Sequence, residues 1–156
     1  MTYRVLTIAS QATLTLRRYN MIDRPVTLPT PLKELVSKSL SICKIMLLNS
    51  DVFYPFAAIN QDGKNGCIFA DETTESKRES QLIEQLQWRI IDTTTDTNSY
   101  SVLVYAATIN TQNSKNVDAI AVVTSSPDQE ERLLLYPYYK VDGSVVVSPP
   151  INTAAP

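Results

Sequence analysis

The chain has 156 residues with a total mass of 17.4 kDa; 44% of the residues are hydrophobic and 19% are charged. This size allows one domain with a core that needs neither disulfides nor a structural metal, and the composition excludes a disordered chain and a membrane protein. The net charge is −2 at pH 7 and the chain contains no histidine. Because histidine is the usual general base near neutral pH and the usual zinc ligand, Ser-His and Cys-His pairs and ordinary zinc sites are excluded.

No segment has the pattern of a transmembrane helix or of a secretory signal. The longest apolar-leaning run, residues 40–48, contains Ser41 and Lys44 and is shorter than the roughly 20 residues that a spanning helix needs. Near the N-terminus, Ser10 and Gln11 interrupt the apolar residues, which is not typical of a signal peptide. We therefore expect a cytoplasmic protein with no membrane partner.

Residues 1–29 differ from the rest of the chain in charge. Residues 1–24 contain Arg4, Arg17, Arg18 and Arg24 but only one acid, Asp23, whereas the remainder is acidic. The first twenty residues are rich in β-branched side chains, although nothing between the two strand-like runs is a clear turn. We interpret residues 1–29 as an N-terminal extension with strand-like alternation, residues 30–148 as a single domain, and the proline-rich residues 149–156 as a loose tail.

The next segment, residues 30–49, has the clearest periodicity in the chain. Thr30 and Pro31 are typical of a helix N-terminus, where the hydroxyl caps the first turn and the missing N–H of the proline costs nothing. The apolar residues that follow recur at three- and four-residue steps: Leu32, Leu35, Val36, Leu40, Cys43, Met46 and Leu47. This spacing predicts an amphipathic helix that ends near Asn49.

Residues 52–71, with the sequence VFYPFAAINQDGKNGCIFAD, predict a hairpin of two extended segments joined at Asp62-Gly63 or Asn65-Gly66. Pro55 cannot donate to a ladder, so we expect the first of these strands to lie at an edge or to carry a bulge. A second helix follows a charged link, with one face marked by Leu82, Ile83, Leu86 and Ile90.

From residue 100 the apolar residues alternate with a period of two. Residues 100–109, 117–124, 132–141 and 144–147 predict strands separated by short polar links, the tightest of which is Asp142-Gly143. The fold class predicted is therefore α+β, in the order α-β-β-α-β-β-β(-β), with an antiparallel sheet of about five strands and both helices packed on one face.

This order of elements resembles the profilin-like and roadblock/longin group of small α+β domains, although the chain has no clear final helix. A helix followed by FYPFA and an Asp-Gly turn is also similar to small uncharacterised bacterial proteins. The resemblance implies a fold and no activity.

Motifs that could carry chemistry are few. Ser41 and Lys44 match the S-x-x-K pattern of serine acyl-transfer enzymes, but the S-D-N and K-T-G companions are absent and a solvated helix face explains the pair. Asn60, Asp62 and Asn65 lack the spacing of a calcium loop. Three acids of the charged link, Asp71, Glu72 and Glu75, could form an acid pair of the glycosidase type, but they also suit a solvated loop.

Further candidates are excluded by residue type. Three glycines are too few for dinucleotide-binding or Walker loops, and we expect no cofactor, metal site or catalytic residue. Nucleic-acid binding would depend on Arg17, Arg18 and Arg24, and the acidic remainder of the chain opposes it. Cys43 and Cys67 are too few for a disulfide framework, so we expect two reduced, buried thiols.

Among the remaining residues, the aromatic ones are the best candidates for a binding site, because tyrosine combines a large apolar surface with a polar end and is enriched at interfaces. We expect at least one tyrosine pair on the sheet face away from the helices; ordinary cross-strand packing is the alternative. The candidate binding residues are Tyr54, Phe56, Tyr136, Tyr138 and Tyr139.

The scarcity of catalytic residue types favours a non-enzymatic interaction module that binds another protein or a second copy of itself, to give a homodimer. An immunity protein or a secretion chaperone is a narrower version, by analogy of size and charge alone. The alternative is a small-ligand-binding protein or enzyme with a carboxylate/tyrosine pocket between sheet and helices.

Overall fold

The computed structural model describes residues 2–7, 15–20, 27–69, 78–94, 98–110 and 116–153, with the backbone alone at 2–7, 15–20 and 152–153. It contains two helices, α1 (Thr30–Asn49) and α2 (Glu79–Thr93). The strands are β1 (Thr2–Thr7), β2 (Thr15–Asn20), β3 (Phe56–Gln61), β4 (Lys64–Phe69), β5 (Ser99–Asn110), β6 (Val117–Ser126), β7 (Gln129–Val141), β8 (Ser144–Val147) and β9 (Ile151–Thr153). No helix of the described chain is long and apolar enough to cross a membrane.

All described strand pairs are antiparallel, and the long strands β5, β6 and β7 form the centre of the sheet. The first part of β5 pairs with β3 and its last part pairs with β1. In the same way, β7 pairs with β9 in its middle and with β8 in its last part. The predicted α+β class and the order from α1 to β8 are confirmed. The sheet has more strands than the predicted five because β1, β2 and β9 join it at the two ends of the chain.

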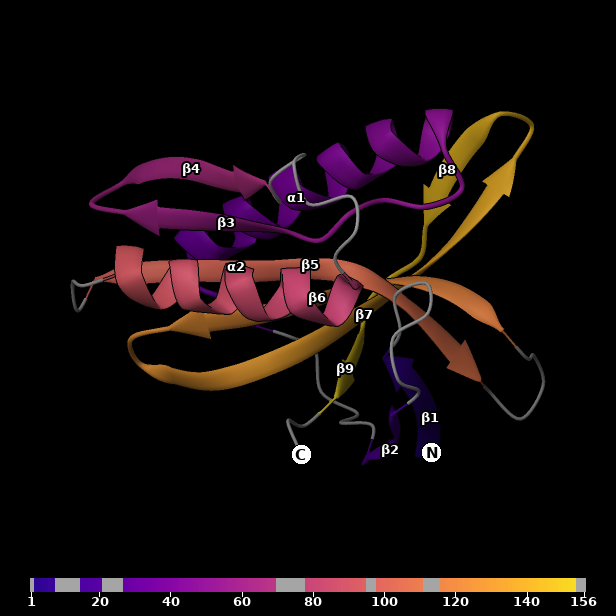
Figure 1. Cartoon of the computed structure of the whole chain (residues 1–156), viewed down its shortest axis with the longest axis horizontal. Helices are drawn as coiled ribbons and strands as arrows, with labels where there is room; N and C mark the ends of the chain where they lie inside the picture. The colour runs from indigo at the N-terminus through magenta and orange to yellow at the C-terminus, as the bar shows by residue number, and fades with distance from the viewer. Residues whose placement is uncertain are drawn as a thin grey trace.

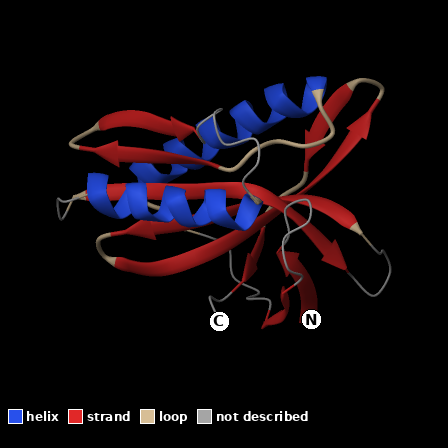
Figure 2. Cartoon of the chain, viewed as in Figure 1, coloured by secondary structure: helices blue, strands red, loops and turns tan. Residues whose placement is uncertain are grey.

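The two helices cover opposite faces of the sheet, as Figures 1 and 2 show: α2 lies in front of the sheet and α1 behind it. On the α1 face, Leu35 and Leu47 pack in one core cluster with Phe56, Val104 and Val122. On the other face, α2 contributes to a second cluster, whose members include Leu86, Ala57, Leu103, Ala121 and Leu135. Neighbouring residues of a strand point to opposite faces, so even- and odd-numbered residues of β5 serve different helices.

The prediction that both helices pack on one face is therefore wrong. Val102, Leu103, Val104 and Tyr105 are four consecutive buried residues of β5. A strand that is apolar at successive positions is buried on both faces and needs a cover on each.

Helix α1 forms over the predicted residues but begins differently from the prediction. Pro29 occupies the N-cap position, Thr30 is already helical, and no side chain caps the first turn. The residues that α1 buries recur at steps of three and four along one face of the helix: Leu32, Leu35, Val36, Ser39, Cys43 and Leu47. Ser50 follows as the C-cap in an extended conformation, which turns the chain toward β3.

The predicted hairpin forms as β3 and β4, with Asp62 and Gly63 at φ 53° and 78° in the turn. Positive φ at both central residues is typical of a tight two-residue turn. Pro55 lies just before β3, outside the ladder, so the prediction of an edge strand or a bulge is wrong: β3 lies between β4 and β5 and pairs with both without a register shift. Across the hairpin, Asn60 Nδ2 donates to Asn65 Oδ1 at 2.7 Å.

Strands also form near both ends of the chain. In the predicted N-terminal extension, β1 pairs with β2 and joins the sheet through β5. Residues 151–153, which were predicted to belong to a loose tail, form β9 and pair with β7, with Ile151 opposite Leu135. The reason is that Ile151 adds an apolar side chain to the cluster on the α2 face. The domain boundaries at residues 29 and 148 stay a prediction.

Candidate functional site

The β7–β8 hairpin has two faces of different character, which its turn and register define. Asp142 and Gly143 form the turn with φ of 49° and 79°, and Tyr139 lies opposite Val146 in the ladder. Alternation therefore directs Tyr138 to one face and Tyr139 to the other. One face of the hairpin packs toward α1, and the other, which we call the outer face, carries Tyr139, Val141 and Val146.

The inner face of this hairpin continues the core under α1. Tyr138 is buried there, and Val145 and Val147 pack against the same cluster. Two other predicted binding residues, Phe56 and Tyr136, are buried in this cluster as well. The expectation of a tyrosine pair on a sheet face away from the helices is thus wrong for Tyr136 and Tyr138: α1 covers their face, so these side chains contribute to packing, as the alternative had it.

On the outer face the side chains are open to solvent. Tyr139, Val141 and Val146 are 50%, 52% and 49% exposed. Tyr139 and Val146 are directly opposite each other, and Val141 lies two residues along the same face. Together they form a small apolar surface with one aromatic ring, on a hairpin whose other face is anchored in the core.

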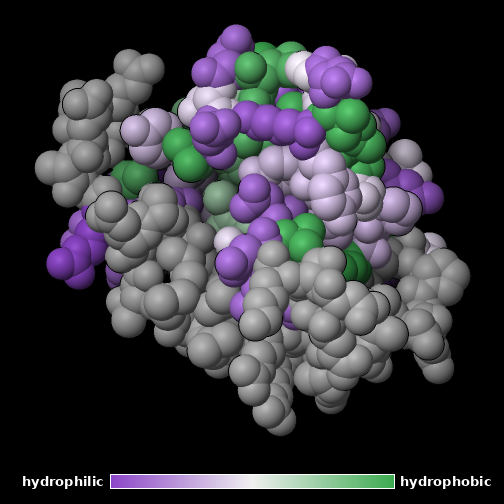
Figure 3. Space-filling view, turned by 90° about the vertical axis from the view of Figure 1, so that its right-hand side faces the viewer, coloured by the Kyte–Doolittle hydropathy of each residue, from purple (hydrophilic) through white to green (hydrophobic). Residues whose placement is uncertain are grey.

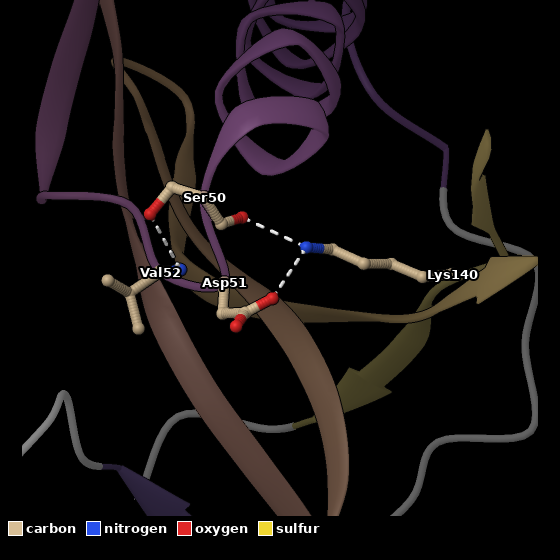
Figure 4. Close-up of polar contacts among 4 residues, drawn as sticks. All are labelled: Ser50, Asp51, Val52 and Lys140. Atoms are coloured by element: carbon tan, nitrogen blue, oxygen red, sulfur yellow. Dashed lines mark hydrogen bonds and ion pairs between the residues drawn. The ribbon is translucent and has the colours of Figure 1, made fainter. Parts of the chain in front are cut away.

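A polar contact connects this hairpin to the end of α1. Lys140 Nζ donates to the carbonyl oxygen of Ser50 and lies 3.0 Å from Asp51 Oδ1, and the amide of Val52 donates to Ser50 Oγ, as Figure 4 shows. A cation at the C-terminal end of a helix is favoured by the helix dipole. Asp51 is fully open to solvent, so the ion pair adds at most about 1 kcal/mol to stability. Its main effect is to hold the hairpin beside residues 50–52.

Further exposed apolar residues come from the segments next to this contact. Ile45 and Leu48 lie on the last turns of α1, and Val52 and Tyr54 follow Asp51. With the outer face of the hairpin, these segments supply seven of the ten large hydrophobic residues that are exposed in the described part of the chain. Figure 3 looks at this end of the molecule and shows green hydrophobic patches separated by polar and pale residues. We call the seven residues the apolar end.

A small cavity of about 400 Å³ lies beside the Lys140–Asp51 contact, and Asp118, Tyr138 and Tyr139 also line it. Burial, and then electrostatic interaction with Asp118, Cys43 and Asp51, raise the pKa of the Tyr138 hydroxyl to about 12. Tyr138 therefore stays neutral at physiological pH and cannot act as a phenolate base. The cavity thus borders the apolar end with a neutral hydroxyl, one cation (Lys140) and two carboxylates (Asp51 and Asp118).

The motifs considered for catalysis have ordinary structural roles. Ser41 Oγ donates to the Ser37 carbonyl at 3.1 Å, as a helix serine in contact with its own backbone does. Cys43 is buried, which raises the pKa of its thiol to about 12 and keeps it protonated. Cys67 is exposed, so the expectation of two buried thiols is wrong for Cys67, which lies on the edge strand β4.

Other sequence candidates are placed as follows. Asn60 and Asn65 bind each other across the β3–β4 hairpin, which supports the interpretation as a turn. The acids Asp71, Glu72 and Glu75 lie outside the described residues, as does Arg24. In the described ranges, no three histidine, cysteine or acidic residues are grouped so that they could hold a metal ion.

Comparison of the chain with protein-family models, with curated proteins and with solved structures finds no match. The resemblance to profilin-like and roadblock/longin domains, and to bacterial proteins with an FYPFA segment, therefore stays a prediction.

Of the five predicted binding residues, the structure places two, Tyr54 and Tyr139, at the apolar end with exposed rings. Sequence analysis missed Val141 and Val146. Their signal was present, because the Asp142-Gly143 turn fixes the register and alternation then places Tyr139, Val141 and Val146 on one face.

Proposed function

We propose that this protein is a non-enzymatic interaction module that binds a protein partner through the apolar end, with the outer face of the β7–β8 hairpin as its centre. The observation that carries this proposal is that Tyr139, Val141 and Val146 are exposed together on one face of the hairpin; the other four exposed apolar residues of the apolar end lie on the neighbouring segments. Isolated exposed apolar residues are normal on any surface, whereas their concentration marks an interaction site.

The chemistry of these residues suits a protein partner. Protein interfaces are enriched in aromatic and large apolar side chains at their centre and are polar at their rim. Tyr139 and Tyr54 supply exposed rings, Val141 and Val146 supply aliphatic surface, and Lys140 and Asp51 supply charge beside them. The hairpin is anchored by Tyr138 in the core, so a partner would meet a surface that is already ordered, which lowers the entropic cost of binding.

The proposal admits a second copy of the chain or a different protein as the partner. The narrower version, an immunity protein or a secretion chaperone, stays a prediction that depends on size and charge. Of the residues considered for catalysis, Ser41 donates to the carbonyl oxygen of Ser37 in its own helix, which favours a structural role for this serine.

Photo-crosslinking tests the proposal directly. A benzophenone amino acid placed at Tyr139 replaces one exposed ring by another, and the same amino acid at Trp88 is the matched control. Trp88 is 60% exposed and lies on α2, whose C-terminal end is at the opposite side of the molecule from the β7–β8 hairpin in Figure 1. We expect irradiation in cells of the source organism to give a discrete adduct from position 139 and none of the same mass from position 88.

The mass of the adduct distinguishes the two kinds of partner. A band at twice the chain mass indicates a second copy, which light scattering of the purified protein then has to confirm as a dimer. Any other discrete mass indicates a different protein. If positions 139 and 88 give the same adducts, or if neither gives any, the apolar end is not a binding surface.

A further inference from the structure

A second, larger cleft lies on the opposite face of the sheet from α1, beside the C-terminal half of α2. Its volume is about 850 Å³, within the range of small-molecule sites. Figure 1 shows that the end of α2, the start of β5 and the β6–β7 turn lie together there, at the opposite side of the molecule from the β7–β8 hairpin. This cleft is therefore separate from the apolar end.

Apolar groups form much of the wall of this cleft. Trp88 and Ile91 come from the exposed side of α2, and Leu103 and Val123 come from β5 and β6. Trp88 and Ile91 are each 60% exposed, although both are large and lie on a helix that buries its other side. An exposed indole beside an apolar sheet surface offers a flat contact to an apolar or aromatic group.

The charged groups in the cleft all have the same sign. Glu84 extends the wall on α2 and Glu131 lies on β7, and the described residues that line the cleft include neither lysine nor arginine. Two carboxylates from different elements, in the same cleft as an exposed indole, favour a cation. A cation gains from both carboxylates and also from the ring quadrupole of tryptophan.

Hydroxyl groups complete the polar part of the wall at Ser99, Ser101, Ser125 and Ser126. The Oγ atoms of Ser99 and Ser126 are buried and have no hydrogen-bond partner in the structure. The ladder between β6 and β7 is irregular between Thr124 and Ser126, and such a bulge redirects the side chains near it. A buried hydroxyl without a partner is costly, so these two groups are available to a ligand that carries N–H or O–H donors.

We propose that this cleft binds a small organic cation with an apolar body, of the class of protonated aryl or alkyl amines, whose N–H groups can donate to the serine hydroxyls. The apolar body lies against Trp88 and the sheet, and the cationic group lies between Glu84 and Glu131. The proposal concerns a site distinct from the protein-binding surface, so neither depends on the other.

Trp88 makes the test direct because it is the only tryptophan in the sequence. The purified full chain is titrated at pH 7 with cationic benzylammonium, with neutral benzyl alcohol and with anionic phenylacetate, and Trp88 fluorescence is recorded. We expect a saturable change with the cation and at least tenfold weaker binding of the other two compounds. The apparent affinity of the cation should fall as the salt concentration rises.

Two carboxamide variants locate the cationic group, with a neighbouring residue as control. Glu84→Gln and Glu131→Gln should each weaken binding of the cation about fivefold, the size of one partly screened charge interaction. Glu130→Gln removes the same charge from the adjacent, exposed residue of β7, which does not line the cleft, and should change the affinity by less than twofold. All three are surface changes, and circular dichroism verifies that each variant is folded.

Three results would overturn the proposal. The first is a cation that gives no saturable change in fluorescence up to tens of millimolar. The second is equal binding of the neutral and cationic compounds, which would indicate a merely apolar cleft. The third is an equal effect of Glu130→Gln and Glu131→Gln, which would indicate a general response to net charge.

Discussion

Leu47 and Leu48 provide a matched test of how α1 is buried, because they are neighbours in one helix with the same side chain. Leu47 is completely buried, whereas Leu48 is 56% exposed. Replacing leucine by alanine removes the equivalent of about three methylene groups, or about 2.4 kcal/mol of transfer free energy if the side chain is fully buried. A cavity adds to this, so we expect Leu47→Ala to lower the free energy of unfolding by about 3 to 5 kcal/mol.

For Leu48 the same reasoning gives a much smaller effect. Less than half of this side chain is buried, so the transfer contribution is about 1 kcal/mol or less, and no enclosed cavity forms. Urea unfolding followed by circular dichroism and by Trp88 fluorescence measures both values. Equal destabilisation by the two variants would refute the reasoning, because it would mean that Leu48 is as well covered as Leu47 in the particle in solution.

Other predictions follow from burial, ionisation and backbone conformation. A disulfide reagent at pH 8 should modify Cys67 quickly and Cys43 only on unfolding. Rapid reaction of both thiols would contradict the burial of the Cys43 side chain between α1 and the sheet. Burial raises the pKa of Cys43 from 9.0, and that of Tyr136 from 10.0, each to about 12. Because the folded state holds these protons more tightly than the unfolded state, their contribution to the free energy of unfolding should be fully present below pH 9 and should fall as the pH rises toward 12. The fall should be smaller in Tyr136→Phe. A urea midpoint that is unchanged between pH 8 and 11 would contradict this. Gly143→Ala should lower the free energy of unfolding by about 1 kcal/mol because φ at this residue is positive. Gly66→Ala should lower it by less, because Gly66 has no positive φ and has open space around it. Denaturant midpoints that the two substitutions lower equally would contradict the turn geometry.

The local part of the fold could be predicted from the sequence. The spacing of apolar residues from Leu32 to Leu47 fixes one helical face, and the structure has α1 over the predicted range. Asp62-Gly63 and Asp142-Gly143 both predict tight turns, and both pairs have positive φ. These features depend on neighbouring residues alone, so no knowledge of the tertiary structure is needed.

Placement of the helices could not be read from alternation alone. Alternation correctly separates Tyr136 and Tyr138 from Tyr139, but it does not say which set faces a helix. A second signal was available, because consecutive apolar residues from Val102 to Tyr105 require that both faces of β5 be covered. Applied to β5, that rule predicts helices on opposite faces.

The candidate sites could be predicted from the sequence only in part, for a related reason. Tyr139 and Val146 meet across a turn that the sequence shows clearly, so the outer face of the hairpin could have been predicted. The cleft beside α2 could not, because Trp88, Ser99 and Glu131 come from three elements that are brought together only by the packing of α2 on the sheet. A single exposed tryptophan in a helix pattern carries no such information.

The central claim is that the outer face of the β7–β8 hairpin holds a protein partner. The most direct measurement is the dissociation constant of the complex captured at Tyr139, or of the dimer, for Val146→Ser and for Ile91→Ser. Both substitutions remove an exposed branched aliphatic side chain, but Ile91 lies on α2. We predict about tenfold weaker binding for Val146→Ser, which is the loss of one buried valine, and an unchanged constant for Ile91→Ser. Equal constants for the wild type and Val146→Ser would contradict the claim.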